Sequence, residues 1–465
     1  AFNRHVAEGH YAFLAGQVGQ HGWWWYFPLA LVIKTPLPTL LLLVIALISR
    51  LRLCRQSQRA SWTDDVWLLA IPVVYFINAM LSTIDIGYRH LLPIFPFLFI
   101  FIAVQIAGRK TQNASHASVT LSHCHLVSLS PRHLVTLLLT LLFAWQIVGT
   151  LHIFPDYVAY FNELVGGPSG GYHYLVDSNT DWGQTLKELK RYLDVHDISN
   201  VNLSQFTFID PGIYGLSYRP IAPMKGAPPV LPARFNPPPG MYAISTTTLQ
   251  GIPLADPEQF DWFRRRAPEA QIGHAMFVYS VGAASSLSLR PRAWVAQCTT
   301  PATPLEPALM AEGFGRDDLR LAYFDCAQSW LYPTGGQAPG WFALAKAAEI
   351  GDARWLAAAR LSYEQRRAGF SPPFRIYEYN GPAADSAGRG HVLIAPSALP
   401  LPDAIATPAV DLPITFENGL TLLGFTLEQP VIKPGGTAYV ETVWRVDSVP
   451  GRLLSIMAHA LGPDG

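Results

Sequence analysis

Charge is the property that this sequence has least of. Only 14% of its 465 residues are Asp, Glu, Lys or Arg, where a soluble domain carries about 25%. The 33 basic residues equal the 33 acidic ones, so the formal net charge is zero. This composition, half of it hydrophobic, excludes a disordered chain and argues against a purely soluble enzyme. Without a basic excess we also expect no nucleic acid partner.

Several local patterns of catalytic sites are missing too. The sequence has no glycine-rich phosphate loop, no zinc-ligand spacing and no nucleophile elbow. We therefore expect neither a bound metal nor a cofactor.

The few charges are unevenly distributed. Residues 1–153 hold ten Lys or Arg and four Asp or Glu, which leaves 23 and 29 for the rest. A membrane helix needs about 20 mainly apolar residues. The first third offers such stretches at about residues 23–49, 66–84, 91–108 and 134–152. We therefore predict about four transmembrane helices within residues 1–155.

The loop charges predict the orientation of these helices. The loop after the first helix contains four arginines between Arg50 and Arg59, and the loop after the third contains Arg109, Lys110 and Arg132. Loops rich in Lys and Arg face the cytoplasm. The first 22 residues and everything after His152 should then lie outside.

The remaining two thirds are expected to be water-soluble. Alternating strand-like and helix-like stretches predict an α/β domain over residues 156–285 and a second α/β-like module over residues 286–382. The stretch from Pro339 to Ala343 echoes the one from Pro239 to Ala243, which suggests an internal repeat, with coincidence as the alternative.

The last part of the chain changes character again. Residues 383–413 are rich in Pro and Ala and are predicted to form a linker. Residues 414–465 alternate as strands do and are predicted to begin a β-sandwich that is cut short. Because the chain starts at Ala1 without a signal-peptide pattern, we expect a fragment with both ends missing.

The chain has four cysteines, and two of them fall in the part expected outside. Exported compartments permit disulfides. We predict that Cys298 and Cys326 pair.

Two cationic positions mark the predicted outer ends of the helices. Lys34 lies inside an apolar stretch, where a charge is expensive and commonly functional. Arg89 and His90 precede the third helix, and arginine binds phosphate with a planar fork of donors. Together they favour an anion site. The plainer alternatives are a snorkelling lysine and an arginine that anchors the helix at the interface.

A second group of polar residues follows the last helix. Asp177, Asn179, Asp181, Trp182 and Gln184 fall within eight residues. Carboxylates and amides bind hydroxyl groups and an indole stacks on a sugar ring, so the segment suits sugar recognition. Helix capping is the alternative for some of them. The intervening stretch, Tyr157 to Gly171, is better explained as a docking segment between membrane and soluble layers.

These segments together resemble one known family. Residues 23–38, 87–93, 160–164 and 177–184 resemble bacterial glycosyltransferase family 39 proteins, which are dolichyl-phosphate-mannose protein mannosyltransferase-like members of the GT-C membrane group. The stretch Trp25-Tyr26-Phe27-Pro28 is also similar to a motif of the lipid A aminoarabinose transferases.

The resemblance implies the back half of a GT-C fold in the bacterial cytoplasmic membrane. It implies transfer of a sugar from a polyprenyl-phosphate donor to a glycan, lipid or protein acceptor at the outer face, amid membrane lipids. Tyr26, Lys34, Arg89 and His90 become candidates for binding the donor phosphate. The catalytic carboxylate is expected upstream of Ala1, so we expect the fragment to be inactive. The alternative is a non-catalytic, membrane-anchored module that binds carbohydrate or a partner.

Overall fold

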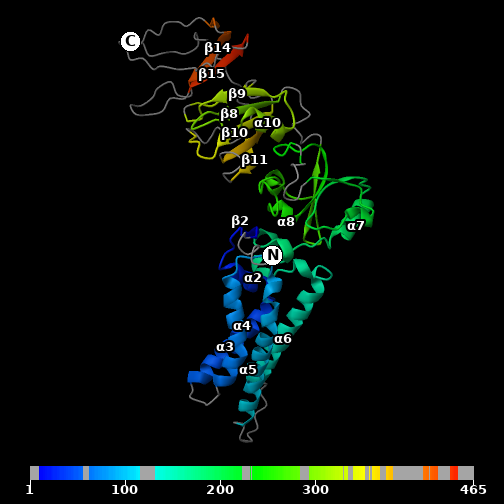
Figure 1. Cartoon of the computed structure of the whole chain (residues 1–465). Coiled ribbons are helices and arrows are strands. Elements are labelled where there is room, and N and C mark those ends of the chain that lie inside the picture. The colour runs from blue at the N-terminus through cyan, green and yellow to red at the C-terminus, as the bar shows by residue number, and fades with distance from the viewer. Residues whose placement is uncertain are drawn as a thin grey trace, which may run out of the picture.

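The computed structural model describes residues 10–55, 62–115, 131–221, 231, 233–282, 293–327, 329–333, 339–350, 356, 359–366, 373–380, 412–417, 419–427 and 440–448. Helices form a bundle at one end of the molecule, and three sheets follow one another away from it (Figure 1). The predicted linker lies almost wholly outside the described residues.

The helical end begins with a small hairpin of β1 (Ala12–Leu14) and β2 (Gln17–Gly19). The 3-10 helix η1 (Tyr88–Ile94) leads directly into the helix that begins at Phe95. The α-helices of this end are α2 (Tyr26–Lys34), α3 (Leu37–Arg55), α4 (Trp62–Met80), α5 (Phe95–Ser115) and α6 (Pro131–His152).

Two stretches of the described chain are helical, long and apolar enough to cross a membrane, Tyr88–Ile106 and His133–His152. Helices α2 and α3 together are also long and apolar enough, but the chain bends by 109° between them. They add a third crossing if they form one broken span. The apolar part of α4, Asp65–Met80, is shorter. Of the four predicted spans, two or three are therefore supported by length and composition.

The break between α2 and α3 has a local cause. Pro36 favours an extended residue before it, and Thr35 is extended with φ −85° and ψ 134°. The carbonyls freed at the break are satisfied by Asn162, whose side-chain amide donates to Val32 O (2.6 Å) and Thr35 O (2.8 Å). Its backbone N–H donates to Ile33 O (2.8 Å). The segment after α6 thus holds the broken helix, as the docking interpretation requires.

That segment consists of short 3-10 helices rather than regular structure. They are η2 (Tyr157–Ala159), η3 (Glu163–Val165), η4 (Gly171–His173) and η5 (Asp177–Asn179). The helix α7 (Leu186–Val195) follows this segment. It buries Leu186, Leu189 and Leu193, which the helical period places on one face.

The first five-stranded sheet has the strand order β4-β3-β5-β7-β6. Strand β3 pairs in parallel with β4 and β5, while β7 pairs antiparallel with β5 and β6. The strands are β3 (Val201–Ser204), β4 (Tyr218–Pro220), β5 (Gly240–Ser245), β6 (Ala270–Ile272) and β7 (Met276–Val281). Its connections contain η6 (Pro211–Tyr214), α8 (Thr246–Leu249) and α9 (Asp261–Arg264).

The second sheet has the order β11-β12-β10-β8-β9. Its strands are β8 (Trp294–Cys298), β9 (Arg320–Phe324), β10 (Gly340–Ala345), β11 (Ala359–Gln365) and β12 (Phe374–Tyr379), with α10 (Pro307–Phe314) between β8 and β9. Strand β8 is parallel to β9 and β10, and β12 is antiparallel to β10 and β11.

The two sheets therefore have one topology. Strands β3 to β7 correspond in chain order, sheet order and direction to β8 to β12. The echoed sequences fall at matching places, since Gly240 begins β5 and Gly340 begins β10. Gly240 pairs with Val281, the last residue of β7, and Gly340 pairs with Tyr379, the last residue of β12. This agreement favours an internal repeat over coincidence.

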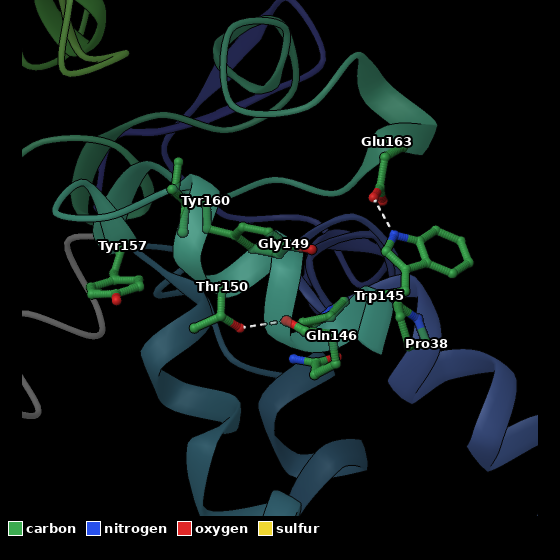
Figure 2. Close-up of a pocket in the computed structure, with 10 residues that line it drawn as sticks. Pro38, Trp145, Gln146, Gly149, Thr150, Tyr157, Tyr160 and Glu163 are labelled. Atoms are coloured by element: carbon green, nitrogen blue, oxygen red, sulfur yellow. Dashed lines mark hydrogen bonds between the residues drawn. The ribbon is translucent and has the colours of Figure 1, made fainter. Parts of the chain in front are cut away.

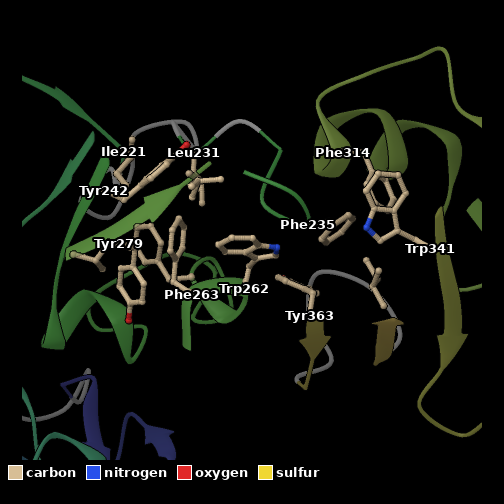
Figure 3. Close-up of a cluster of buried hydrophobic side chains, with 14 of the residues drawn as sticks. Ile221, Leu231, Phe235, Tyr242, Trp262, Phe263, Tyr279, Phe314, Trp341 and Tyr363 are labelled. Carbon is tan, nitrogen blue, oxygen red and sulfur yellow. The ribbon is translucent and has the colours of Figure 1, made fainter. Parts of the chain in front are cut away.

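One hydrophobic core joins the two sheets. Figure 3 shows Tyr242, Phe263 and Tyr279 on the first sheet's side and Trp341 on the second sheet's side, with Trp262, Tyr363 and Phe235 between them. All of them belong to a single cluster of buried side chains. The predicted boundary near residue 285 therefore separates two sheets but not two cores.

Further structure is described beyond the two sheets. Cys298 and Cys326 form a disulfide, with Cα atoms 5.4 Å apart, which is the expected pairing. Strands β13 (Ile414–Thr415), β14 (Leu420–Leu427) and β15 (Val440–Val446) form an antiparallel three-stranded sheet. The predicted sandwich would need a second layer, and the rest of this predicted domain lies outside the described residues.

Candidate functional site

The polar segment from Asp177 to Gln184 lies where the first sheet meets the helices. Asn179 donates from its side-chain amide to the Tyr26 hydroxyl (2.9 Å) and accepts from the Tyr88 backbone N–H (2.9 Å). The neighbouring Ser178 hydroxyl donates to Ile86 O. These bonds tie the segment to α2 and to the start of η1, so the structure brings both predicted groups of residues together.

Lys34 has a structural place in this junction. Its side chain is buried, and Nζ donates to Val158 O (2.9 Å) and Asn179 O (2.5 Å). The ammonium also lies 4.4 Å from the centre of the Phe161 ring. Tyr26 is equally buried and bonded to Asn179. The polar atoms of Lys34 and Tyr26 are therefore bonded inside the protein, and their contact with a donor phosphate stays a prediction.

Two of the predicted sugar-binding residues also have structural roles. Asp181 is fully buried and accepts from the Ser245 hydroxyl (2.6 Å) and the Gly183 N–H (2.7 Å). Gln184 accepts from the Trp182 N–H (2.7 Å) and donates to Thr180 O (2.8 Å). They close the turn and dock it on the end of β5. Asn179 is also buried, whereas Gln184 is exposed, so Asn179 and Asp181 use their polar atoms inside the protein.

The accessible part of the predicted site is Arg89 with Trp182. Arg89 is exposed at the start of the Tyr88–Ile106 span, and its guanidinium carbon lies 5.2 Å from the centre of the Trp182 ring. Trp182 is 43% exposed, and its ring also lies 5.9 Å from that of Phe206. His90 is partly buried, and its Nε2 atom has no hydrogen-bond partner among the described residues.

Asp177 lies close to this pair. Its backbone has φ 63°, a left-handed conformation that a non-glycine residue adopts at an energetic cost. Its N–H donates to the Thr247 hydroxyl (3.0 Å), and its carboxylate accepts from the Ser178 N–H (2.5 Å). Burial raises the pKa of the Asp177 carboxyl to about 7, against the opposing effects of the Ser178 N–H and the Arg89 charge. Strain and a raised pKa together are typical of functional sites.

The sequence interpretation missed a second buried carboxylate. Asp85 accepts from the Trp23 N–H (2.6 Å), while its other oxygen is buried and has no partner among the described residues. Burial raises the pKa of Asp85 to about 6. Gly22 makes this approach possible, because a Cβ there would lie 2.8 Å from the carboxylate. The only signal in the sequence was an acid directly after an apolar stretch.

A cavity of about 200 Å³ opens beside the broken helix. Pro36 and Pro38 line it from the break, and Trp145, Gln146 and Thr150 line it from α6. Figure 2 shows Tyr157 and Tyr160 on the same side as Gly149 and Thr150, and Glu163 bonded to the Trp145 ring nitrogen (2.9 Å). The cavity is adjacent to the site, since Thr35 beside Pro36 is hydrogen-bonded to the Tyr88 hydroxyl (2.8 Å).

Comparisons with known proteins identify no relative: no family model, curated protein or solved structure matches the chain. Within the described residues, no group of three or more His, Cys, Asp or Glu side chains is placed to hold a metal ion.

Proposed function

We propose that the protein is an integral membrane glycosyltransferase that transfers a sugar from a polyprenyl-phosphate donor to an acceptor at the outer membrane face. The observation that carries the proposal is the exposed Arg89–Trp182 pair, at the start of a membrane-length helix and beside the buried carboxylate of Asp177. The motif resemblance described above supports it from the sequence.

Arg89 and Trp182 suit the phosphate and the sugar ring of a lipid-linked sugar. A phosphate that links lipid and sugar lies at the membrane surface, and its negative charge grows as the sugar leaves. A fixed guanidinium near it stabilises that charge in the transition state. The exposed part of Trp182 offers a surface on which a sugar ring stacks. Of the four candidate phosphate ligands, Arg89 is therefore the one on which the proposal mainly rests.

The cavity beside the helix break gives the lipid a place. It lies between α3 and α6, and α6 exposes nearly all of its apolar surface. An isoprenoid chain lying there would contact Pro36 and Pro38. Pro36 follows Thr35, whose hydroxyl is hydrogen-bonded to that of Tyr88 (2.8 Å), the residue before Arg89. We assign no catalytic base to any residue of the chain. The proposed arrangement has four spans with α4 among them, and the sheets lie outside a bacterial cytoplasmic membrane.

Binding of a polyprenyl phosphate tests this proposal. We expect native mass spectrometry of the protein in nanodiscs to detect bound undecaprenyl phosphate. Arg89→Gln should weaken binding at least about tenfold, since a charge-assisted contact contributes about 1.5–3 kcal/mol. The matched control is Arg320→Gln, which removes an exposed arginine from β9 of the second sheet. Equal binding by both variants would contradict the assignment of Arg89.

A further inference from the structure

A compact loop after β3 carries an unusually exposed aromatic side chain. Phe208 is 88% exposed, the largest fraction among the large hydrophobic side chains of the described residues. Ile209 beside it is 38% exposed. Isolated apolar residues at a surface need no explanation, but a phenylalanine at a loop tip beside a second apolar residue forms a patch.

The loop is held in one shape by its own hydrogen bonds. Gln205 donates from its side-chain amide to Ile209 O (3.0 Å), and the Ile209 N–H donates to the Thr207 hydroxyl (3.2 Å). These bonds close residues 205–209 on themselves. The loop backbone is thereby held with Phe208 at its exposed tip.

Contacts place this loop at the level where the membrane helices begin. The ring of Phe206 lies 5.9 Å from that of Trp182, and Trp182 lies under the Arg89 guanidinium at 5.2 Å. Gly183 lies against Thr207 so closely that a Cβ would be 2.7 Å from its methyl group. Arg89 is one residue into the Tyr88–Ile106 span. The patch is therefore continuous with the outer end of that span.

The direction of β3 agrees with this placement. Its last residue, Ser204, is hydrogen-bonded to Thr248 (2.7 Å), and Thr246 is bonded to Thr180 (3.0 Å). Thr180 follows Asn179, which is bonded to α2. The carboxyl end of β3 thus points at the helices, and the loop that leaves it extends on the same side.

We propose that residues 205–209 insert into the outer interface of the lipid bilayer and anchor the first sheet above the helices. Aromatic side chains favour this zone of a membrane. The stretch 205–209 contains no charged residue, and Asp210 directly follows it. Insertion should therefore depend on apolar burial and not on anionic headgroups. This inference rests on the helices lying in a membrane and not on the proposed transferase activity.

Spin labelling of the full chain in nanodiscs tests the anchor. Cys54 and Cys124 are replaced by Ser, the disulfide is kept, and a nitroxide is attached at Phe208→Cys. Because Phe208 has almost no contacts, this substitution should not disturb folding. Labels at Val148→Cys, on the exposed face of α6, and at Leu321→Cys, on β9, serve as the membrane and water references. The nanodiscs contain phosphatidylcholine alone or with phosphatidylglycerol.

We expect the accessibility of the nitroxide to oxygen, divided by its accessibility to a nickel complex, to be several-fold higher at position 208 than at position 321. This ratio should be equal in both lipid mixtures. A ratio at 208 equal to that at 321 would overturn the anchor. A higher ratio that appears only after undecaprenyl phosphate is added would also overturn it, because the loop would then be a substrate contact. The transferase proposal is unaffected by either result, since it depends on Arg89.

Discussion

The two five-stranded sheets share one topology but differ at the carboxyl ends of their parallel strands. In the sheet next to the helices, β3 and β5 end in Ser204 and Ser245, and these hydroxyls bond to Thr248 and Asp181. In the distal sheet, β8 and β10 end in Cys298 and Ala345, and the cysteine is in a disulfide. Ligand sites of α/β sheets lie at this end of the strands.

Two sheets of one topology therefore use the ends of their parallel strands differently. The proximal sheet uses polar strand ends to hold the strained Asp177 segment against the helices. The distal sheet uses a covalent bond at the same place and adds its aromatic residues to the shared core. Function in a shared fold depends on such local sites and not on the topology. The predictions below test whether the two sheets differ in this way.

The largest expected effect comes from removing the disulfide. Cys298→Ser with Cys326→Ser should lower the free energy of unfolding by about 3–4 kcal/mol, as expected for a loop of this length. The two cysteines are 28 residues apart. Because the sheets share one core, we expect faster hydrogen exchange in β7 as well as in β8. Faster exchange confined to the distal sheet would show that the two cores are independent.

A smaller effect is expected from Asn179→Ala. The substitution leaves the Tyr26 hydroxyl and the Tyr88 N–H without their partner, at a cost of about 2–3 kcal/mol. The amide of Tyr88 should exchange faster. The matched control is Gln297→Ala, which removes an equally buried amide bonded to Leu305 in the distal sheet. If Gln297→Ala also accelerates exchange at Tyr88, the contact between the Asn179 segment and the helices does not open independently of the distal sheet.

A third prediction concerns pH, and its effect per pH unit is the smallest. The pKa of Asp177 is raised by burial from 3.8 to about 7, so the folded state keeps a proton that the unfolded state loses. The contribution of this group to stability is therefore fully present below about pH 4 and is lost as pH rises to about 7, at a slope of at most about 1.4 kcal/mol per pH unit. Asp85 and Asp181, each raised to about 6, act in the same direction.

The Asp177→Asn variant should flatten this slope, as thermal unfolding between pH 4.5 and 8 would show. Asparagine tolerates the left-handed backbone at this position. Asp318→Asn, at an exposed position of the distal half, is the control and should leave the slope unchanged. A wild-type stability that does not change with pH would contradict the burial of a protonated Asp177.

The sequence predicted most of the helices and strands but not the roles of individual polar residues. Hydrophobic stretches and proline positions located α2 to α6, and the echo of Pro239 to Ala243 pointed to the repeat. Which polar residues face a ligand could not be read from the sequence, because that depends on contacts between distant segments. Lys34 bonds to carbonyls 124 and 145 residues away, and Asp181 to Ser245. Asp85 was missed for the same reason, since its partner is Trp23.

The most direct test of the central proposal is sugar transfer. Membranes containing the natural protein, with the upstream segment expected to supply the catalytic carboxylate, would be incubated with radiolabelled hexoses and pentoses linked to undecaprenyl phosphate. Label released from the lipid into acceptor material would be counted, and residues 1–465 alone are expected to show no transfer. We predict transfer from at least one donor, reduced about 100-fold or more by Arg89→Gln at equal protein level, as for loss of one charge-stabilising group. Arg320→Gln should have no effect. Carbohydrate binding without any transfer, or transfer that Arg89→Gln leaves unchanged, would contradict the proposal.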